Sequence, residues 1–267
     1  MHRRRVSLNF GTGLESDVAG EERRYALVTG ASQGLGRCYA LELARCGIDT
    51  VLVSLPDSGL NEVVIESRRL GGRCIPFEID LCDEEALSVL CRDVNAGYPL
   101  FMLINNAGTG GTRRFASCTS DYLDRILHLN VSVPTLLTFY LLPNLQRAPE
   151  AFILNVASMA AFSPTGFKTV YPATKRFVLQ FSLGLREELR GAKIAVSVVT
   201  PGPMKTNGEA VSNVRSSSAG WGCFPPRRWP ALVSADCCVV RRSFYPAGRT
   251  ASTDCCSCLF LYLSVSG

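Results

Sequence analysis

The stretch YALVTGASQGLG, residues 25–36, decides the fold of this 267-residue chain. Residues 25–28 form a short apolar run typical of a buried strand, a glycine-rich turn follows at once, and a helical pattern continues to Leu43. Gly30 permits a tight turn, Gly34 lets the backbone approach a pyrophosphate, and Gly36 allows close packing, while the helix N-terminus offers free N–H groups to an anion. The sequence therefore predicts a dinucleotide-binding turn made of Gly30, Ser32, Gln33, Gly34, Leu35 and Gly36.

Five further apolar runs follow along the chain, at residues 50–55, 74–79, 101–104, 152–157 and 194–199. Helical patterns separate them, and strands that alternate with helices are joined by right-handed crossovers into a parallel sheet. We therefore predict an α/β fold, a Rossmann-like doubly wound parallel sheet in a single domain.

Composition and charge limit the classes of function. Hydrophobic residues make up 47% of the chain, enough for a full core, and the sequence has no uncharged apolar run of about 18 residues that would predict a transmembrane helix. The basic start lacks the apolar region of a signal peptide, so we expect a cytoplasmic protein. The net charge is +5, but residues 215–267 hold six arginines and two aspartates and supply most of it. The body is nearly neutral and has no basic and aromatic stripe, so we expect no nucleic-acid partner.

A second stretch, ASMAAFSPTGFKTVYPATK at residues 157–175, gathers three polar groups that suit one reaction. Tyr171 and Lys175 are four apart, so on a helix they share a face, and the ammonium stabilises the phenolate form of the tyrosine. Pro172 is tolerated only in the first turn of a helix, so the helix should begin near Tyr171. Ser158 ends a buried strand, where its hydroxyl can hold a carbonyl oxygen. Taken alone, a Tyr-x-x-x-Lys pair is more typical of a solvated helix face.

Ser158, twelve intervening residues, Tyr171 and Lys175 together resemble the active site of the short-chain dehydrogenase/reductase family. The family's other motifs occur in order: the T-G-x-x-x-G-x-G turn, Asn-Asn-Ala-Gly at residues 105–108, and Pro-Gly at residues 201–202. Within the family the chain is most similar to the hydroxysteroid dehydrogenase and 3-ketoacyl reductase group. The resemblance implies an oxidoreductase that transfers a hydride between NAD(P)(H) and a carbonyl or secondary alcohol substrate. The alternative is a non-catalytic dinucleotide-binding or scaffolding protein, since fold does not guarantee function.

The resemblance assigns catalytic roles to Asn130, Ser158, Tyr171 and Lys175. Ser158 and Tyr171 polarise the substrate carbonyl, Tyr171 donates the proton, and Lys175 lowers the tyrosine pKa and binds the ribose. Asn130 bends its helix and holds a water that relays protons to the lysine. Without the other three residues, Asn130 would be interpreted as a tolerated polar residue on a helix.

The resemblance also assigns cofactor contacts beyond the glycine turn, to Asp80, Asn106, Ala107, Gly108, Tyr171, Lys175, Pro201, Gly202 and Thr206. Asp80 fits equally well as the cap of the helix that follows it. The second strand ends in Ser54 and Leu55, without the acidic residue that binds the ribose of NAD and without the arginine expected for NADP. The absent acid gives a weak lean to NADP.

The resemblance further implies a homodimer or homotetramer, because the helices around Asn130 and after Tyr171 are the family's usual contact faces. It also implies that residues 203–220 form a lid over the substrate. We predict no metal site, since neither histidine has a partner and the pair Cys255 and Cys258 lacks a second ligand pair of the usual form.

The predicted organisation is a flexible leader at residues 1–24, a dinucleotide-binding catalytic domain at residues 25–215 and an atypical tail at residues 216–267. The tail holds six of the twelve cysteines and lacks clean helix or strand patterns, where the family has a helix and a final strand. Cysteine codons begin with TG, so a shifted reading frame converts adjacent cysteines into leucine, methionine or valine. We therefore predict an out-of-frame tail that lacks the family's last helix and strand. The alternative is a genuine disordered or metal-binding appendage.

Overall fold

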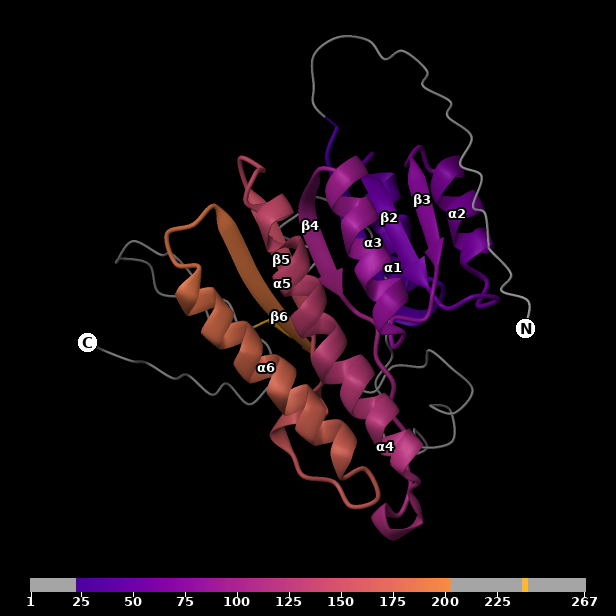
Figure 1. Cartoon of the computed structure of the whole chain (residues 1–267), viewed down its shortest axis with the longest axis vertical. Helices are drawn as coiled ribbons and strands as arrows, with labels where there is room; N and C mark the ends of the chain where they lie inside the picture. The colour runs from indigo at the N-terminus through magenta and orange to yellow at the C-terminus, as the bar shows by residue number, and fades with distance from the viewer. Residues whose placement is uncertain (1–22, 203–236, 240–267) are drawn as a thin grey trace, which may run out of the picture.

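We describe the protein from a computed structural model that defines residues 23–202 and 237–239 (Figure 1). Several predictions lie outside the described residues: the leader up to residue 22, the cofactor contact of Thr206, the lid at residues 203–220, and the tail apart from residues 237–239. The described chain begins its first strand at Tyr25, as the sequence predicted.

The core of the fold is one seven-stranded sheet in the order β3-β2-β1-β4-β5-β6-β7. The strands are β1 (Tyr25–Thr29), β2 (Asp49–Ser54), β3 (Cys74–Glu78), β4 (Leu100–Asn105), β5 (Ala151–Val156), β6 (Ile194–Pro201) and β7 (Cys237–Val239). The first six are parallel, and the chain reverses direction across the sheet between β3 and β4, beside β1. This is the predicted doubly wound parallel sheet, and the reversal opens a crevice at the carboxyl ends of β1 and β4.

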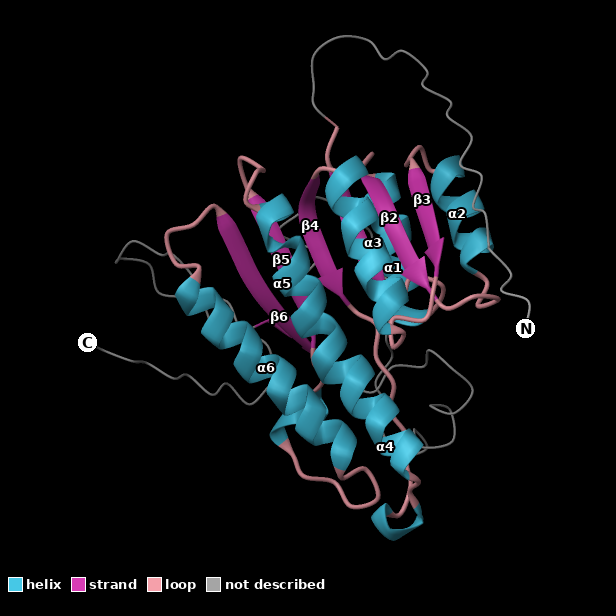
Figure 2. Ribbon diagram, in the orientation of Figure 1, coloured by secondary structure: helices cyan, strands magenta, loops and turns pink. Residues whose placement is uncertain are grey.

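Helices cover both faces of the sheet (Figure 2). They are α1 (Gly34–Arg45), α2 (Leu60–Arg69), α3 (Glu84–Gly97), α4 (Ser120–Leu127), α5 (Val133–Leu145) and α6 (Val170–Glu188), with short helical turns η1 (Phe115–Ser117), η2 (His128–Ser132) and η3 (Met159–Phe162).

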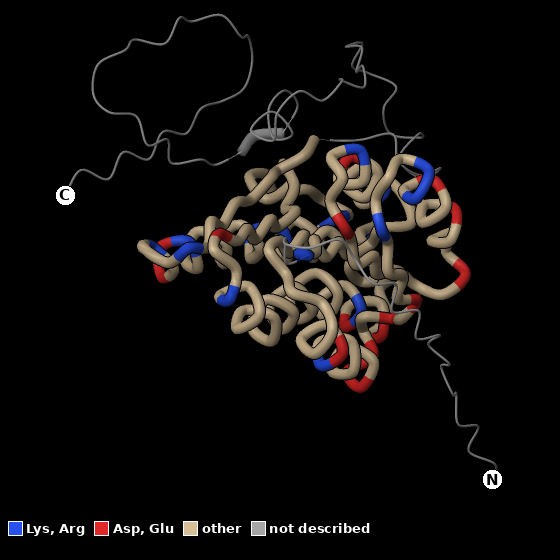
Figure 3. The backbone as a smooth tube through the Cα atoms, turned by 90° about the horizontal axis from the view of Figure 1, so that it is seen from above, with Lys and Arg blue, Asp and Glu red and all other residues tan. Residues whose placement is uncertain are grey.

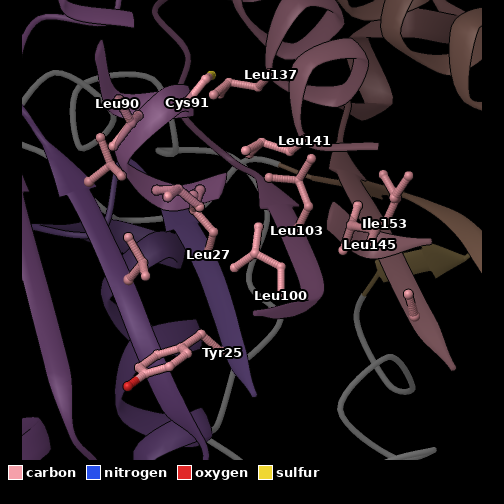
Figure 4. Packing of buried hydrophobic residues seen from close by; sticks show 14 of the residues in the cluster. Tyr25, Leu27, Leu90, Cys91, Leu100, Leu103, Leu137, Leu141, Leu145 and Ile153 are labelled. Atoms are coloured by element: carbon pink, nitrogen blue, oxygen red, sulfur yellow. The ribbon is translucent and has the colours of Figure 1, made fainter. Parts of the chain in front are cut away.

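Side chains along each strand point alternately to the two faces of the sheet, so the core consists of two layers. In β1, Ala26 and Val28 pack with residues of α1 and α2, whereas Leu27 packs on the other face with α3 and α5. The strands are apolar on both faces because helices cover both. Figure 4 shows the second layer, where Leu141 of α5 lies beside Leu103 of β4 and Leu137 lies beside Cys91 of α3.

One helical stretch among the described residues, Ser120–Leu145, is long and apolar enough by length and composition to cross a membrane. It is not a single regular helix, since the π-helical turn η2 separates α4 from α5. Its residues Leu137, Leu141 and Leu145 are fully buried against the sheet. This burial accounts for part of the apolar composition, since 39% of the most apolar window is buried, whereas Phe139 and Tyr140 of α5 are exposed.

The described part of the tail, whose sequence has no strong strand pattern, is a short strand. Residues Cys237–Val239 form β7, which pairs antiparallel with the end of β6 in the register Pro201 to Cys237. A three-residue edge strand needs only extended backbone, so it does not require an alternating pattern in the sequence. The prediction that the tail is out of frame and lacks the family's last helix and strand stays a prediction.

Candidate active site

The glycine turn between β1 and α1 has the backbone geometry that its residues predict. Gly30 and Gly34 adopt φ values of +64° and +56°, in the left-handed region that favours glycine. At Gly36, a Cβ atom would lie 2.0 Å from the carbonyl oxygen of Gly30. Only glycine therefore lets the first turn of α1 approach the strand end so closely, and α1 presents its N-terminal N–H groups there.

Hydrogen bonds fasten this turn to the end of β4. The Thr29 hydroxyl donates to the Ile104 carbonyl (3.3 Å) and accepts from the backbone N–H groups of Asn106 and Ala107 (3.0 Å each). The Asn106 side-chain amide donates to the carbonyl oxygens of Thr29 (2.8 Å) and Gly30 (3.2 Å). Asn106 and Ala107 thus lie beside the glycine turn as predicted, but the Asn106 amide holds the protein's own backbone. Thr29 is the residue of this junction that sequence reasoning missed.

Tyr171 and Lys175 lie where the sequence placed them, at the start of α6. The helix begins at Val170, one residue before Tyr171, with Pro172 in its first turn. The Tyr171 ring packs over Gly110, where a Cβ atom would lie 2.8 Å from the ring. The Lys175 ammonium lies 5.9 Å from the centroid of that ring. The two side chains therefore share a helix face. The alternative of a solvated face does not hold for Lys175, which is only 5% exposed.

Burial changes the chemistry of Lys175. Its ammonium donates one hydrogen bond, to the Val156 carbonyl oxygen at 2.8 Å. No carboxylate forms an ion pair with it among the described residues, and desolvation lowers the pKa of Lys175 to about 8. The ammonium is thus a proton donor poised close to neutral pH.

Ser158 follows the end of β5 and caps the short turn η3. Its hydroxyl accepts from the backbone N–H of Ala160 at 3.2 Å, which leaves the hydroxyl proton free to donate. The sequence predicted a serine at the carboxyl end of a strand, and the structure places it there.

Asn130 lies at the centre of the π-helical turn η2 and is 1% exposed. Its side chain accepts from the Thr109 N–H (2.8 Å) and donates to the Thr109 carbonyl (2.8 Å) and to the Thr174 hydroxyl (3.1 Å). The helix is interrupted at Asn130, as predicted. Thr109 and Thr174, which position it, were missed because hydrogen bonds between distant segments leave no local pattern.

The polar ends of Asn130 and Lys175 come close together at Gly108. A Cβ atom at Gly108 would lie 3.1 Å from the Asn130 side-chain oxygen and 3.2 Å from the Lys175 ammonium nitrogen. The two polar atoms therefore face one small space over Gly108, at hydrogen-bonding distance from its centre. This space fits a bridging water or a cofactor hydroxyl, which is the use the resemblance implies for all three residues.

The end of β2 has neither the acidic residue that binds the ribose of NAD nor the arginine expected for NADP. Three serine hydroxyls lie close together there instead. Ser54 donates to Ser32 in the glycine turn (2.7 Å) and lies 2.8 Å from the Ser58 hydroxyl oxygen. Leu55 is 44% exposed beside them. The end of β2 therefore presents hydroxyl groups where the ribose of a bound dinucleotide would lie.

Asp80 does not cap the following helix, so that interpretation was wrong. Asp83 is the cap of α3 and accepts from the N–H groups of Glu85 and Ala86 (2.9 and 3.1 Å). Asp80 instead accepts from the Cys82 N–H (3.0 Å) and from the Arg125 guanidinium (3.0 Å). The hydrogen bonds from Cys82 and Arg125 outweigh burial and lower the pKa of Asp80. The predicted contact of Asp80 with the adenine stays a prediction, and in the structure both carboxylate oxygens accept hydrogen bonds from the protein itself.

Pro201 and Gly202 lie at the end of β6, so the described part of the third predicted turn is at the same edge of the sheet.

A buried network of polar side chains under the site was not predicted. The Asn105 amide donates to the side chains of Thr138 (3.1 Å) and Asn155 (2.8 Å), and Asn155 donates to Ser182 (2.9 Å). It fixes β4 and β5 to α5 and α6 beneath the catalytic residues.

Known proteins share this arrangement. The profile of a family described as short chain dehydrogenase matches residues 24–216. Ketoacyl reductase HetN of a Nostoc species is 32% identical over 202 residues, which cover 75% of this chain and 70% of that protein. The 17-beta-hydroxysteroid dehydrogenase type 3 of Mus musculus is 30% identical over 203 residues, with 74% and 66% covered. Probable oxidoreductase EphD of Mycobacterium tuberculosis is 32% identical over 183 residues, and the chain spans only 31% of its length.

Solved structures agree with the sequence comparisons. A short-chain dehydrogenase from Sphingobium yanoikuyae in complex with NADPH superposes with a TM-score of 0.65 at 32% identity, and the match covers 68% of this chain and 72% of that chain. The bulky-bulky ketone specific alcohol dehydrogenase from Comamonas testosteroni matches with a TM-score of 0.65 at 31% identity, over 68% and 73% of the two chains. Sequence, sheet order and site geometry agree, and the chain belongs to the short-chain dehydrogenase family.

Proposed function

We propose that the protein is an NAD(P)-dependent oxidoreductase that interconverts a carbonyl compound and a secondary alcohol. The observation that carries the proposal is the juxtaposition of Tyr171 with a buried lysine whose pKa is lowered to about 8. A non-catalytic dinucleotide-binding protein has no need to bury a cation that costs stability.

The residues divide the chemistry among themselves. When bound, the nicotinamide cofactor would supply or accept the hydride. In the direction of reduction, Ser158 and Tyr171 donate hydrogen bonds to the carbonyl oxygen, and Tyr171 transfers its proton to that oxygen as negative charge develops. Lys175 stabilises the phenolate that remains, and the space over Gly108 connects its ammonium to Asn130 for proton return.

The cradle for the cofactor would be the glycine turn, the α1 N-terminus and the turn at residues 106–108. We further propose a preference for NADP. The Ser32 hydroxyl accepts from Ser54 and keeps its own proton to donate to a phosphate, and β2 ends in Ser54 rather than in a carboxylate that would repel it. Two similar structures, from Sphingobium yanoikuyae and from a metagenomic source, hold NADPH and NADP.

Oxidation of NADPH and NADH with a panel of ketones tests the activity. The wild-type protein should turn over, and Tyr171→Phe should lose about a hundredfold or more in kcat, as expected for removal of a general acid. A protein that binds a dinucleotide but oxidises it no faster than Tyr171→Phe is not an enzyme of this kind. Thermal shifts with NADP and NAD test the preference, and Ser54→Asp should move it toward NAD.

We also propose a homo-oligomer in the cytoplasm. Phe139 and Tyr140 on α5 and Phe177 on α6 are 69%, 43% and 41% exposed, which favours a contact face on these helices. Cys46, Cys74, Cys82, Cys91 and Cys118 form no disulfide within the described part of the chain, as in a reducing compartment. Light scattering of the purified protein, compared with Phe139→Glu, measures the oligomeric state.

A further inference from the structure

Two loops form the walls of a pocket that opens beside Tyr171. The first follows β4 at residues 108–114, and the second precedes α6 at residues 163–169. A backbone hydrogen bond from the Arg113 N–H to the Phe167 carbonyl oxygen (2.6 Å) joins them. Beside Tyr171, the lining residues on which the argument depends are Arg113, Phe115, Tyr122, Ile126, Phe167 and Lys168.

The charged lining of this pocket is entirely basic. Arg113 and Lys168 are its charged members, and none of its described lining residues is acidic. Arg114 extends the basic edge, with its guanidinium 5.3 Å from the Phe167 ring centroid. The nearest acid in sequence, Asp121, is exposed at the start of α4 and does not line the pocket. Elsewhere in the described chain, basic and acidic positions are interspersed along the backbone (Figure 3), so this one-signed lining is a local feature.

The Arg113 guanidinium is held in place before any ligand arrives. It stacks 4.3 Å from the Tyr122 ring centroid, and its own backbone is fixed by Phe167. Stacking uses the face of the guanidinium and leaves its N–H edge free to make paired hydrogen bonds with a planar anion. A stacked arginine therefore loses less side-chain freedom when it binds an anion than a mobile one would.

The rest of the pocket is apolar and partly open. Phe115 and Phe167 are 59% and 53% exposed at its rim, and Ile126 is buried at its base. Exposed aromatic rings beside a reactive group favour the binding of an apolar body.

Resting on the proposed function, we infer that the substrate is a carbonyl compound with an apolar body and an anionic end group. The carbonyl lies at Tyr171, the body against Phe115 and Phe167, and the carboxylate or phosphate at Arg113 and Lys168. Reduction adds a hydride from the reduced dinucleotide to the carbonyl carbon and a proton from Tyr171 to its oxygen, and the anionic group does not react.

The test compares three ketones that share one aliphatic body: a keto acid, its primary amide and the corresponding phosphate ester. We expect kcat/KM for at least one anionic ketone to exceed that of the amide by about tenfold, the effect of two exposed cations, and to fall as salt is added. The phosphate ester and the keto acid distinguish the two anions. In the double variant Arg113→Gln and Lys168→Gln, kcat/KM for the acid and the phosphate should fall to the value that the same variant has with the amide.

Two further variants separate charge from folding. Arg113→Lys keeps the charge and should retain part of the preference. Arg69→Gln removes an exposed arginine at the end of α2, across the sheet from the pocket, and should change nothing. Equal kcat/KM for acid, phosphate and amide, or a preference that survives in the double variant, overturns the inference and leaves the proposed activity intact.

If no ketone is reduced, the proposed function fails, and calorimetric binding of the same compounds decides the inference by itself. Tighter binding of an anionic ketone than of the amide, abolished in the double variant, supports it. Equal binding of all three compounds contradicts it.

Discussion

Replacing Lys175 with methionine should remove a specific pH dependence from the stability of the ligand-free protein. Burial lowers the pKa of Lys175 in the folded protein to about 8, whereas the unfolded chain has the ordinary value of 10.5. Between these two pH values the unfolded chain holds a proton that the folded protein has released. The free energy of unfolding of the wild type should therefore rise with pH in this window, and below about pH 8 this contribution is constant.

The magnitude follows from the two pKa values. They differ by about 2.5, and each pKa unit corresponds to about 1.4 kcal/mol, so the rise amounts to about 3 kcal/mol. Lys175→Met has an apolar side chain of similar length and no proton to lose. Its stability advantage over the wild type should be greatest near neutral pH and should shrink by about 3 kcal/mol by about pH 10.5.

Urea unfolding followed by circular dichroism, with a reductant present, measures both proteins at a series of pH values across the window. Other titrating groups, such as Tyr25 with its raised pKa, are present in both proteins and cancel in the difference. Parallel stability curves for the two proteins would refute the argument, because they would mean that Lys175 titrates at the same pH in the folded and unfolded chains.

Three other perturbations follow from the geometry. Gly36→Ala should destabilise the protein by about 2 kcal/mol and weaken the NADP-dependent thermal shift, because its Cβ atom would lie 2.0 Å from the Gly30 carbonyl oxygen. The matched control is Gly184→Ala, within α6, where a Cβ atom would have nothing within 4 Å. This variant should gain about 0.5–1 kcal/mol in the free energy of unfolding. Asn130→Ala breaks three hydrogen bonds at a buried site and should cost about 3 kcal/mol in urea unfolding, and a loss below about 1 kcal/mol would mean that water replaces the amide. Iodoacetamide should label the exposed Cys38 but not Cys91, which is only 4% exposed. Burial also raises the pKa of the Cys91 thiol to about 12, so little reactive thiolate forms. Equal labelling of the two residues in peptide mass spectra would contradict the described packing.

The strands and the glycine turn were predictable because local sequence determines them. Each predicted strand exists within one or two residues of its predicted ends, since a strand covered on both faces needs a continuous apolar run. The position of α6 followed from Pro172, whose ring excludes it from a helix interior. The close approach at Gly36 followed from the spacing of the glycines.

What the sequence could not predict depends on contacts between distant segments. Asp80 and Asp83 are both plausible caps in sequence, and only the ion pair of Asp80 with Arg125, 45 residues away, distinguishes them. The hydroxyls of Ser32 and Ser54 meet because β1 and β2 are neighbours in the sheet, a fact that neither residue's surroundings in sequence reveal. The stacking of Arg113 on Tyr122 has the same origin.

The Thr29 hydroxyl has one proton and two lone pairs, and the junction of β1 and β4 uses all three. The two turns that would hold the two halves of a dinucleotide are consequently parts of one rigid body. The conformational entropy of these two turns is lost when the chain folds, so the binding of a dinucleotide does not have to order them a second time. Dinucleotide association should then follow simple one-step kinetics at these turns, with affinity adjusted by how fast the ligand leaves.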